Sequence, residues 1–578
     1  MENINRRKFL ACAAGFVPFA RIFAMPKEAP AMRLGVMSDT HVGETVESCG
    51  RLRMALELFK AKGAELIINN GDIADHFYPT GYQAYRQVAE EVYGSDYAPQ
   101  EIFAYAWHDA FDYHQHTRDQ IVSDAPIAFE EARRLLKAPN GHTAEVRFKG
   151  YTFLVMPQFT GSKGFLSWDE YEAKVASACR ANPGKPVFVV DHVPPEGTVY
   201  NSYNWGSSSM RKVLEKYPQV VDFSGHVHGS LRNDLLIWQK EFTVINSGCL
   251  QKWDGLLSGN EPANKQAFGV LTVDVYSDRL LVRRWDVRDK SEIDPEHPWV
   301  VPLPFAAETA PYVRARRAAT EPKPRFSPSA RLSVVPEGRP FTGFKLSFPE
   351  VGAHTMLYRI AAQRKDGNGD WATFTWLEIY SDYWMFPKDR TGRAEFLFRP
   401  EYFNPDTEYR FMVAPVNQYG VSGCPICAEA KSPAVFAKKE TLYVSEHPMQ
   451  ELVFCRSRGS NRHVVADDGF YGPISGGQWL KLPEGLFKGP KGTKFLATID
   501  MRTVQPAEGS QWGISFYDPI RSTCVSGRML TPPGDSSDER YVLEFVKRND
   551  LDTCYIQFDW GTDGRVKFNH LKIERVWP

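Results

Sequence analysis

The chain has almost no excess charge of either sign. Its 69 lysines and arginines against 70 aspartates and glutamates give a formal net charge of -1 over 578 residues. Without a basic surface, nucleic-acid binding is not expected. The 43% hydrophobic and 24% charged fractions are those of an ordinary globular protein. The length predicts roughly three or four domains.

Long hydrophobic runs are scarce as well. The run at the N-terminus, Phe9 to Ala20, follows the paired arginines Arg6 and Arg7. It is too short to span a bilayer comfortably, so no transmembrane span is expected in the mature chain. The arrangement resembles a twin-arginine export signal over residues 1–24, which predicts a periplasmic or secreted protein. The alternative is a basic start before a chance apolar run.

Cysteine is sparse, and its nine residues show no zinc-finger spacing. Cys424 and Cys427 have the spacing of a redox motif. They lie in a β-rich segment rather than before a helix, which favours a local disulfide or two free thiols over catalysis.

Ligand-type side chains follow short apolar, strand-like runs throughout residues 30–305. The motifs are, in order, Asp39-Thr40-His41, Gly71-Asp72-Ile73-Ala74-Asp75, His108-Asp109, His192 and Gly225-His226-Val227-His228. Strands that alternate with helices and end in such residues predict an α/β sheet with a site at its carboxyl edge. If the apolar run before the last motif ends as a strand, His226 and His228 could reach one small volume from its carboxyl end, and converging imidazoles are natural ligands for a transition metal.

The ordered series resembles the calcineurin-like metallophosphoesterase family over about residues 30–305. The resemblance implies an α/β sandwich of mixed sheets flanked by helices, with two metal ions bridged by a carboxylate. The ions would be divalent or trivalent transition metals (Mn, Fe or Zn), and the sequence does not choose among them. By motif position, the first metal would be held by Asp39, His41, Asp72 and His228. Asp72 would also reach the second metal, together with His192 and His226.

The same resemblance implies a reaction. A hydroxide activated by the two metals would attack phosphorus, as in other two-metal hydrolases. His108 would act as general acid on the leaving oxygen, and Asp75 would hold the His108 ring. We therefore expect an exported metal-dependent phosphoesterase that hydrolyses phosphomonoesters or phosphodiesters.

One position departs from the family pattern. The family usually has Gly-Asn-His where this chain has Ala106-Trp107-His108. Tryptophan has one N–H donor and cannot ligate a metal, so the second metal site is in doubt. Purple acid phosphatases place a tyrosine where Asp75 stands and lack a counterpart of His41, which argues against that branch.

The expected substrate-binding residues are Trp107, Asn204 and Trp205. The last two lie in a polar and aromatic loop between His192 and a helix expected to begin at residues 207–209. An ordinary surface loop is the alternative.

The rest of the chain is expected to be non-catalytic. Residues 306–330 are rich in Pro, Ala and Arg and predict a linker. Residues 331–435 resemble a fibronectin type III domain through the segment from Pro405 to Ser422, since a tyrosine at the corner of such a sandwich bonds back to the backbone. Residues 436–578 resemble a jelly-roll module of the carbohydrate-binding or galactose-binding-like kind. Exposed tryptophans of such a module could stack on a glycan partner, and a purely structural sandwich is the alternative. A catalytically impaired glycan-binding or adhesion protein on a phosphoesterase scaffold is the alternative function.

Overall fold

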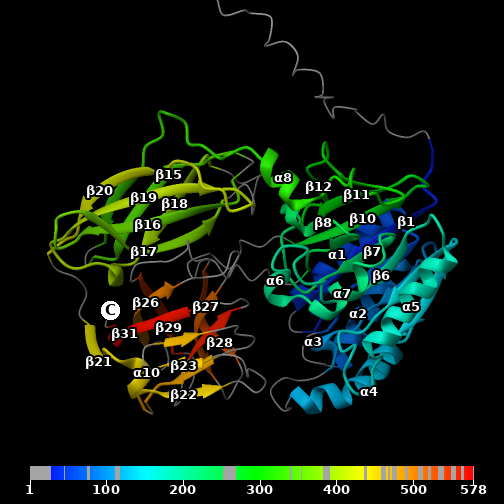
Figure 1. Ribbon diagram of the computed structural model, residues 1–578, viewed down its shortest axis with the longest axis horizontal. Helices are drawn as coiled ribbons and strands as arrows, with labels where there is room; N and C mark the ends of the chain where they lie inside the picture. Colours follow the sequence, from blue (N-terminus) through cyan, green and yellow to red (C-terminus); the bar gives the residue numbers. More distant parts are fainter. Residues whose placement is uncertain are drawn as a thin grey trace, which may run out of the picture.

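The structure is a computed structural model of the chain (Figure 1). It describes residues 28–43, 46–74, 79–110, 118–250, 268–338, 341–352, 355–381, 391–434, 439–456, 464–466, 469–471, 478–483, 485–487, 493–504, 512–518, 523–530, 539–547, 555–560 and 565–576. The expected export signal at residues 1–24 lies outside these ranges.

The first region, from β1 to β13, is built on two mixed sheets. One sheet runs in the order β12-β11-β10-β1-β2-β3, with β13 paired to β11. Its strands are β1 (Met32–Met37), β2 (Leu66–Asn69), β3 (Gln100–Phe103), β10 (Gly269–Val275), β11 (Arg279–Asp286), β12 (Ser291–Ile293) and β13 (Trp299–Pro302). Because β1, β2 and β3 are parallel, their carboxyl ends meet at one edge.

The second sheet runs in the order β4-β5-β6-β7-β9-β8. Its strands are β4 (Ala144–Phe148), β5 (Tyr151–Val155), β6 (Val187–Val190), β7 (Val220–Ser224), β8 (Ile237–Gln239) and β9 (Thr243–Asn246). The central strands β5, β6, β7 and β9 are parallel, so this sheet also gathers several carboxyl ends at one edge.

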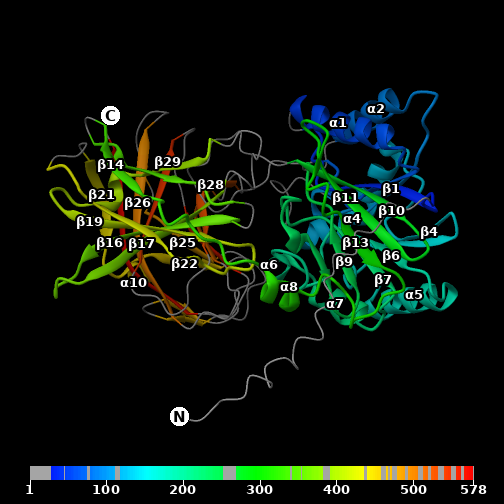
Figure 2. The same cartoon turned by 90° about the horizontal axis from the view of Figure 1, so that it is seen from above.

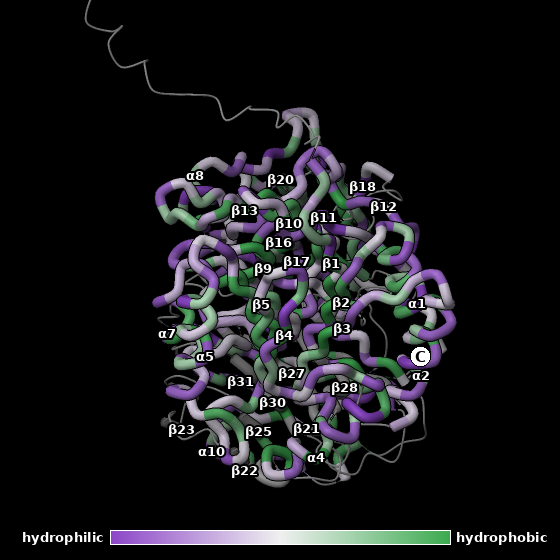
Figure 3. The backbone as a smooth tube through the Cα atoms, turned by 90° about the vertical axis from the view of Figure 1, so that its right-hand side faces the viewer, coloured by the Kyte–Doolittle hydropathy of each residue, from purple (hydrophilic) through white to green (hydrophobic). Residues whose placement is uncertain are grey.

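The two sheets face each other and carry helices on their outer faces. Alternation along β2 shows the arrangement: Leu66 and Ile68 enter the core between the sheets, and Ile67 faces the helices. The first sheet is covered by α1 (Val46–Lys62), α2 (Pro79–Tyr93) and α4 (Arg118–Leu136), and the second by α5 (Trp168–Ala181) and α7 (Ser208–Leu214). Figure 3 shows hydrophobic segments gathered along the inner strands. The predicted α/β class of this region is confirmed.

The middle region, from β14 to β20, is made of strands in two further sheets, β14-β15-β18 and β17-β16-β19-β20. Its elements are β14 (Ser333–Glu337), β15 (Gly343–Pro349), β16 (Leu357–Lys365), β17 (Trp371–Tyr380), β18 (Arg393–Phe398), η2 (Pro400–Tyr402), β19 (Glu408–Val416) and β20 (Ile426–Lys431). The Asn404 N–H donates to the Tyr409 hydroxyl over 2.6 Å, which is the kind of bond expected of a corner tyrosine. Cys424 and Cys427 are both exposed free thiols.

The C-terminal region, from β21 to β31, adds two more sheets, β23-β24-β31-β26-β29 with β21 on β31, and β22-β25-β30-β27-β28. Its elements are β21 (Lys439–Ser445), α10 (Pro448–Glu451), β22 (Val453–Arg456), β23 (Val464–Ala466), β24 (Gly469–Tyr471), β25 (Gln478–Lys481), β26 (Lys494–Val504), β27 (Trp512–Asp518), β28 (Thr523–Leu530), β29 (Glu539–Val546), β30 (Tyr555–Trp560) and β31 (Arg565–Val576). The sheets of both later regions are consistent with β-sandwiches; the fibronectin type III and jelly-roll assignments stay predictions.

The middle and C-terminal regions share their apolar cores. Leu496 and Val542 of the C-terminal region pack into the core of the middle region, and Trp376 of β17 packs into the C-terminal core. The two β regions therefore form one joined body, which lies beside the first region (Figure 2).

The predicted linker contains a short helix, α8 (Arg314–Thr320), which is fixed to the first region. The Arg317 guanidinium forms an ion pair with Asp234 over 2.8 Å and donates to the Asp234 carbonyl over 2.7 Å. Asp234 in turn accepts from Arg284, whose side chain is only 2% exposed. None of the helices in the described ranges is long and apolar enough to cross a membrane.

Candidate metal centre

The ligand-type residues of the sequence motifs meet where the carboxyl ends of the two sheets come together. Asp39 and His41 follow β1, Asp72 follows β2, His192 follows β6, and His226 and His228 follow β7. Three overlapping groups have ligand atoms within 4.8 Å of one another: Asp39, His41 and His228; His41, Asp72 and His108; and Asp72, His192 and His226. The structure therefore brings together all six residues that the family resemblance implies as metal ligands.

The backbone at these positions is unusual. Five of the six residues have positive φ angles, at 52° for Asp39, 41° for His41, 49° for Asp72, 71° for His226 and 45° for His228. Non-glycine residues seldom adopt this conformation, and it costs on the order of 1–3 kcal/mol at each position. Such outliers concentrate at functional sites, because the surrounding structure must hold them in place.

Backbone hydrogen bonds hold the first two loops side by side. The Asp39 N–H donates to the Gly71 carbonyl over 3.0 Å, and the His41 N–H donates to the Asp72 carbonyl over 3.1 Å. The side chain of Asn70 then donates to the carbonyls of Asp191 (2.9 Å) and Phe223 (2.6 Å) at the ends of β6 and β7. Asn70 thus fixes the carboxyl edge of one sheet against that of the other.

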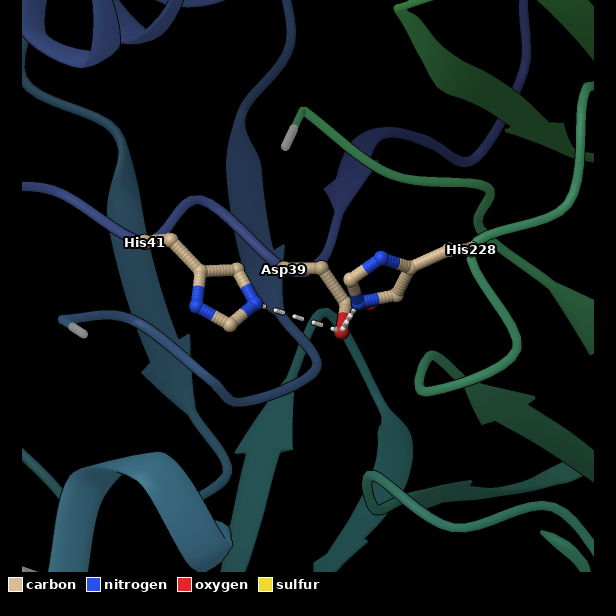
Figure 4. A group of neighbouring side chains, drawn as sticks. All are labelled: Asp39, His41 and His228. Carbon is tan, nitrogen blue, oxygen red and sulfur yellow. Dashed lines mark hydrogen bonds and ion pairs between the residues drawn. The ribbon is translucent and has the colours of Figure 1, made fainter. Parts of the chain in front are cut away.

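Asp39 is the centre of the first group of ligands (Figure 4). Its Oδ1 lies 2.9 Å from His228 Nε2 and 3.9 Å from His41 Nε2. Its Oδ2 accepts from the His226 N–H over 3.0 Å and from the Ser38 hydroxyl. Asp39 is fully buried, and His41 is only 3% exposed. A carboxylate and two imidazoles at these distances suit a borderline transition metal.

The second group gives a test of whether these residues fit a metal. His192 Nδ1 lies 2.9 Å from the Asn70 carbonyl oxygen, which only accepts, so Nδ1 carries the proton. In a neutral ring, His192 Nε2 then presents a lone pair, yet it lies 3.0 Å from Asp72 Oδ2 and 3.2 Å from His226 Nδ1. Two facing acceptors need a positive charge, either a proton or a metal ion. A ligand histidine fixed through its other nitrogen by a carbonyl is the usual arrangement in metal sites, and the residues fit.

Electrostatics support the same conclusion. Burial opposes ionisation of Asp39, but the imidazoles of His228 and His192 outweigh it and hold the pKa of this carboxyl well below its usual range. Burial likewise opposes charge on His192, but the carboxylates of Asp72 and Asp39 raise its pKa to about 9. Burial and the charge on His192 lower the pKa of His226 to about 3, so that imidazole stays neutral and keeps a lone pair that can bind a metal ion.

His108, the expected general acid, lies at the more open side of the centre. Its ring is 4.6 Å from the His41 ring, its Nε2 is 4.0 Å from Asp72 Oδ2, and its side chain is 28% exposed. Its backbone N–H donates to Asp72 Oδ1 over 3.1 Å, which fixes the residue relative to the centre. Asp75, the expected orienting residue, lies outside the described residues.

Trp107 occupies the position where the family usually has Asn, and its half-buried ring packs against the helix-side core. The indole packs 5.5 Å from the Phe159 ring at the core beneath α4. Its backbone N–H donates to Gln158 Oε1 over 2.7 Å. An amide side chain thus contacts this position from Gln158, three residues after β5.

The loop that follows His192 carries the other expected substrate-binding residues. Trp205, at the end of α6 (Ser202–Trp205), has its ring 5.7 Å from the His226 ring. Asn204 lies in the same helix, and its side chain is outside the described part of the structure. Trp205 thus borders the second ligand group.

Two supporting residues were not identified from the sequence. Asn70 was not singled out, although it directly precedes Gly71-Asp72. Asp109 was noted only as the residue after His108; it is fully buried and accepts from the N–H groups of Ile73 (3.0 Å) and Ala106 (3.0 Å). Burial and the nearby Asp72 raise the pKa of Asp109 to about 7. The sequence signal for Asn70 and Asp109 was only that each is a polar residue next to a ligand motif. Both have hydrogen-bond partners at or beyond the ends of other strands, so the sequence did not indicate their role.

Residues 32–230 match the family model of calcineurin-like phosphoesterases. The matched segment contains every ligand-type residue of the centre, so this part of the chain carries a metallophosphoesterase-like α/β fold with clusters that can bind metal. No curated protein matches the chain.

Among solved structures, the chain is similar to purple acid phosphatase PPD1 from yellow lupin (Lupinus luteus) seeds, at 13% identity and a TM-score of 0.32, with 48% of this chain and 55% of the lupin chain covered. The match thus spans about half the length of that protein. The chain is also similar to the CBM22-1 xylan-binding domain of Paenibacillus barcinonensis Xyn10C, at 8% identity and a TM-score of 0.18, with 25% and 99% covered. A third match is the C-terminal CBM6 of LamC from Zobellia galactanivorans, at 13% identity and a TM-score of 0.13, with 24% and 98% covered. At these TM-scores no property of this chain follows from the three structures.

Proposed function

We propose that this protein is a metal-dependent phosphoesterase that hydrolyses phosphomonoesters or phosphodiesters. The observation that carries the proposal is the pair of facing acceptors, His192 Nε2 and Asp72 Oδ2 at 3.0 Å, inside a cluster that also contains Asp39, His41, His226 and His228. The match of residues 32–230 to the calcineurin-like phosphoesterase model supports hydrolysis of phosphate esters at this cluster.

Different residues of the chain would bind the metals, transfer a proton and contact the substrate. Asp39, His41 and His228 would hold one metal, His192 and His226 the other, and Asp72 would reach both. When bound, the metals would offset the negative charge of the phosphoryl group and acidify a water. His108 would protonate the leaving oxygen, because it is the exposed imidazole beside the centre and its backbone is fixed by Asp72. Trp205 would border the organic part of the ester.

The test is metal content and hydrolysis measured on the full chain. Two metals per chain and turnover of p-nitrophenyl phosphate or bis(p-nitrophenyl) phosphate are expected, and Asp72→Asn should abolish turnover. The matched control is Asp274→Asn, which removes the same charge from a buried residue that pairs with Arg33 at the opposite end of β1. A well-folded protein that hydrolyses neither ester with any divalent metal would overturn the proposal and favour the binding-protein alternative.

We also propose that the protein is exported, on the strength of the paired arginines before the apolar run. Fractionation of cells that express the full chain, with Arg6→Lys and Arg7→Lys together as the comparison, tests this. Retention of the substituted precursor in the cytoplasm is expected, and equal export of both forms would contradict it.

A further inference from the structure

Residues 194–207 form a compact loop whose two ends are joined. The Glu196 N–H donates to the Ser207 carbonyl over 3.1 Å, and the Ser207 N–H donates to the Pro194 carbonyl over 2.9 Å. Inside the loop, the fully buried hydroxyl of Ser202 bonds two earlier backbone groups. A loop closed at its base and packed by its own side chains is a compact structural unit.

One side of this loop borders the metal centre. The loop begins two residues after His192, and Trp205 near its end lies 5.7 Å from the His226 ring. Both histidines belong to the second ligand group. The position of the whole loop therefore decides where the Trp205 indole stands relative to that group.

The other side of the loop is held by the middle region. The Tyr200 hydroxyl lies 3.1 Å from the hydroxyl of Tyr380, the last residue of β17, which is 5% exposed. The Tyr200 N–H donates to the Leu235 carbonyl over 2.9 Å. The neighbouring Asp234 N–H donates to Gln418 Oε1 of the middle region over 3.1 Å. The middle region thus contacts the loop through Tyr380 and contacts the neighbouring residue Asp234 through Gln418.

The linker helix adds a third contact. The Arg314 guanidinium of α8 lies 5.9 Å from the centre of the Tyr203 ring, within the loop. Both α6 and α8 lie on the side of the first region that faces the β-rich body (Figures 1 and 2). The loop consequently lies between the metal centre and the linker helix and middle region, with Tyr203 still exposed.

We propose that the middle region positions the 194–207 loop at the metal centre through the hydroxyl pair of Tyr380 and Tyr200. In this position, the Trp205 indole forms a wall of the site that contacts the organic group of a phosphate ester. The proposal rests on the proposed phosphoesterase function. Tyr380 is a positioning residue, since it acts through the loop. Substrates whose organic group is large and planar would depend on this wall, because an indole offers them a stacking face.

The test compares two variants of the full chain that each lose one hydroxyl from the middle region. Tyr380→Phe removes the contact with the loop. Tyr358→Phe is the matched control, because its buried hydroxyl accepts from the Val351 N–H over 2.8 Å within the middle region. Amide hydrogen exchange of residues 198–206 should be about five-fold faster in Tyr380→Phe, the effect of one net hydrogen bond. The control should leave it unchanged.

Kinetics give the second readout. In Tyr380→Phe, KM for bis(p-nitrophenyl) phosphate should rise about two- to five-fold, with kcat and metal content unchanged. Tyr200→Phe should give the same result, and the double variant no more than either single one. Faster exchange with an unchanged KM would overturn the role of Trp205 as a substrate wall. Unchanged exchange in Tyr380→Phe, or an equal change in Tyr358→Phe, would overturn the positioning role. The exchange measurement needs no substrate, so it decides the positioning role even if the protein hydrolyses no phosphate ester.

Discussion

Replacing Gly225 by alanine should damage the metal centre although this residue supplies no ligand. Gly225 directly precedes His226 and lies against the loop of β1. A methyl group added there would stand 1.7 Å from Ser38 Oγ and 2.7 Å from Asp39 Oδ2. The Asn246 amide donates to the Gly225 carbonyl over 2.6 Å, so the backbone of Gly225 is held against simple withdrawal.

The size of the effect follows from these distances. Overpacking a closely packed interior costs about 1–3 kcal/mol, so the free energy of unfolding should fall by that amount. The displaced group is Asp39, whose two oxygens face His228 and the His226 N–H. The added methyl group disturbs Ser38 and the His226 N–H, which orient Asp39, and losing such partners of a metal ligand typically lowers metal affinity about 10- to 100-fold, so we expect a loss in this range.

The assay is isothermal titration of the metal-free protein with Mn²⁺, together with urea unfolding. Gly50→Ala is the control, because a methyl group at Gly50 in α1 meets nothing within 4 Å; it should leave metal affinity unchanged. Adding Ser38→Ala to Gly225→Ala should restore part of the loss, since the closest contact, with Ser38 Oγ, then disappears. Wild-type metal affinity in Gly225→Ala would refute the close approach of these loops.

Three further predictions concern protons. His108→Gln should slow esters with poor leaving groups about 100-fold or more but activated aryl phosphates far less, and equal losses measured across a leaving-group series would exclude a general acid. Because the pKa of His192 is raised to about 9, metal binding displaces its proton, so the affinity of the second site should rise about tenfold per pH unit between pH 6 and 8; a flat profile in calorimetry would contradict this. Burial raises the pKa of Asp222 to about 7 and that of the neighbouring Asp191 well above its usual range, both above about 3.9 in the unfolded chain, so the stability that this protonated pair allows is fully present below pH 4 and falls as the pH rises through 7. Asp222→Asn should therefore flatten the fall in unfolding free energy over this range, as urea denaturation at several pH values would show.

Much of the first region could be predicted from the sequence. Each expected strand before a ligand motif is present, as in β6 (Val187–Val190) before His192 and β7 (Val220–Ser224) before His226. The reason is physical: buried parallel strands are continuous apolar runs, and ligand residues at their carboxyl ends meet at one edge. The order of the motifs was therefore enough to gather the metal ligands.

Other features depend on contacts that no local pattern encodes. Asp39 and His41 have positive φ angles and are held by backbone hydrogen bonds to the loop after β2, and apolar periodicity carries no information on these bonds. The indole of Trp107 turns to the core because Phe159, far along the chain, provides an apolar surface. Likewise, Tyr200 meets Tyr380 across 180 residues, and no local pattern indicates that these two residues pair.

The presence of Trp107 where the family usually has Asn also bears on how the two ligand groups differ. Because an indole cannot ligate a metal, the second group among the described residues consists of one carboxylate, Asp72, and the imidazoles of His192 and His226. The first group has Asp39 in addition to Asp72, so it offers more negative charge to a cation. The second group must also release the His192 proton before a metal binds. Both differences act in the same direction, so the first group should fill before the second, and the second should empty first when the pH falls.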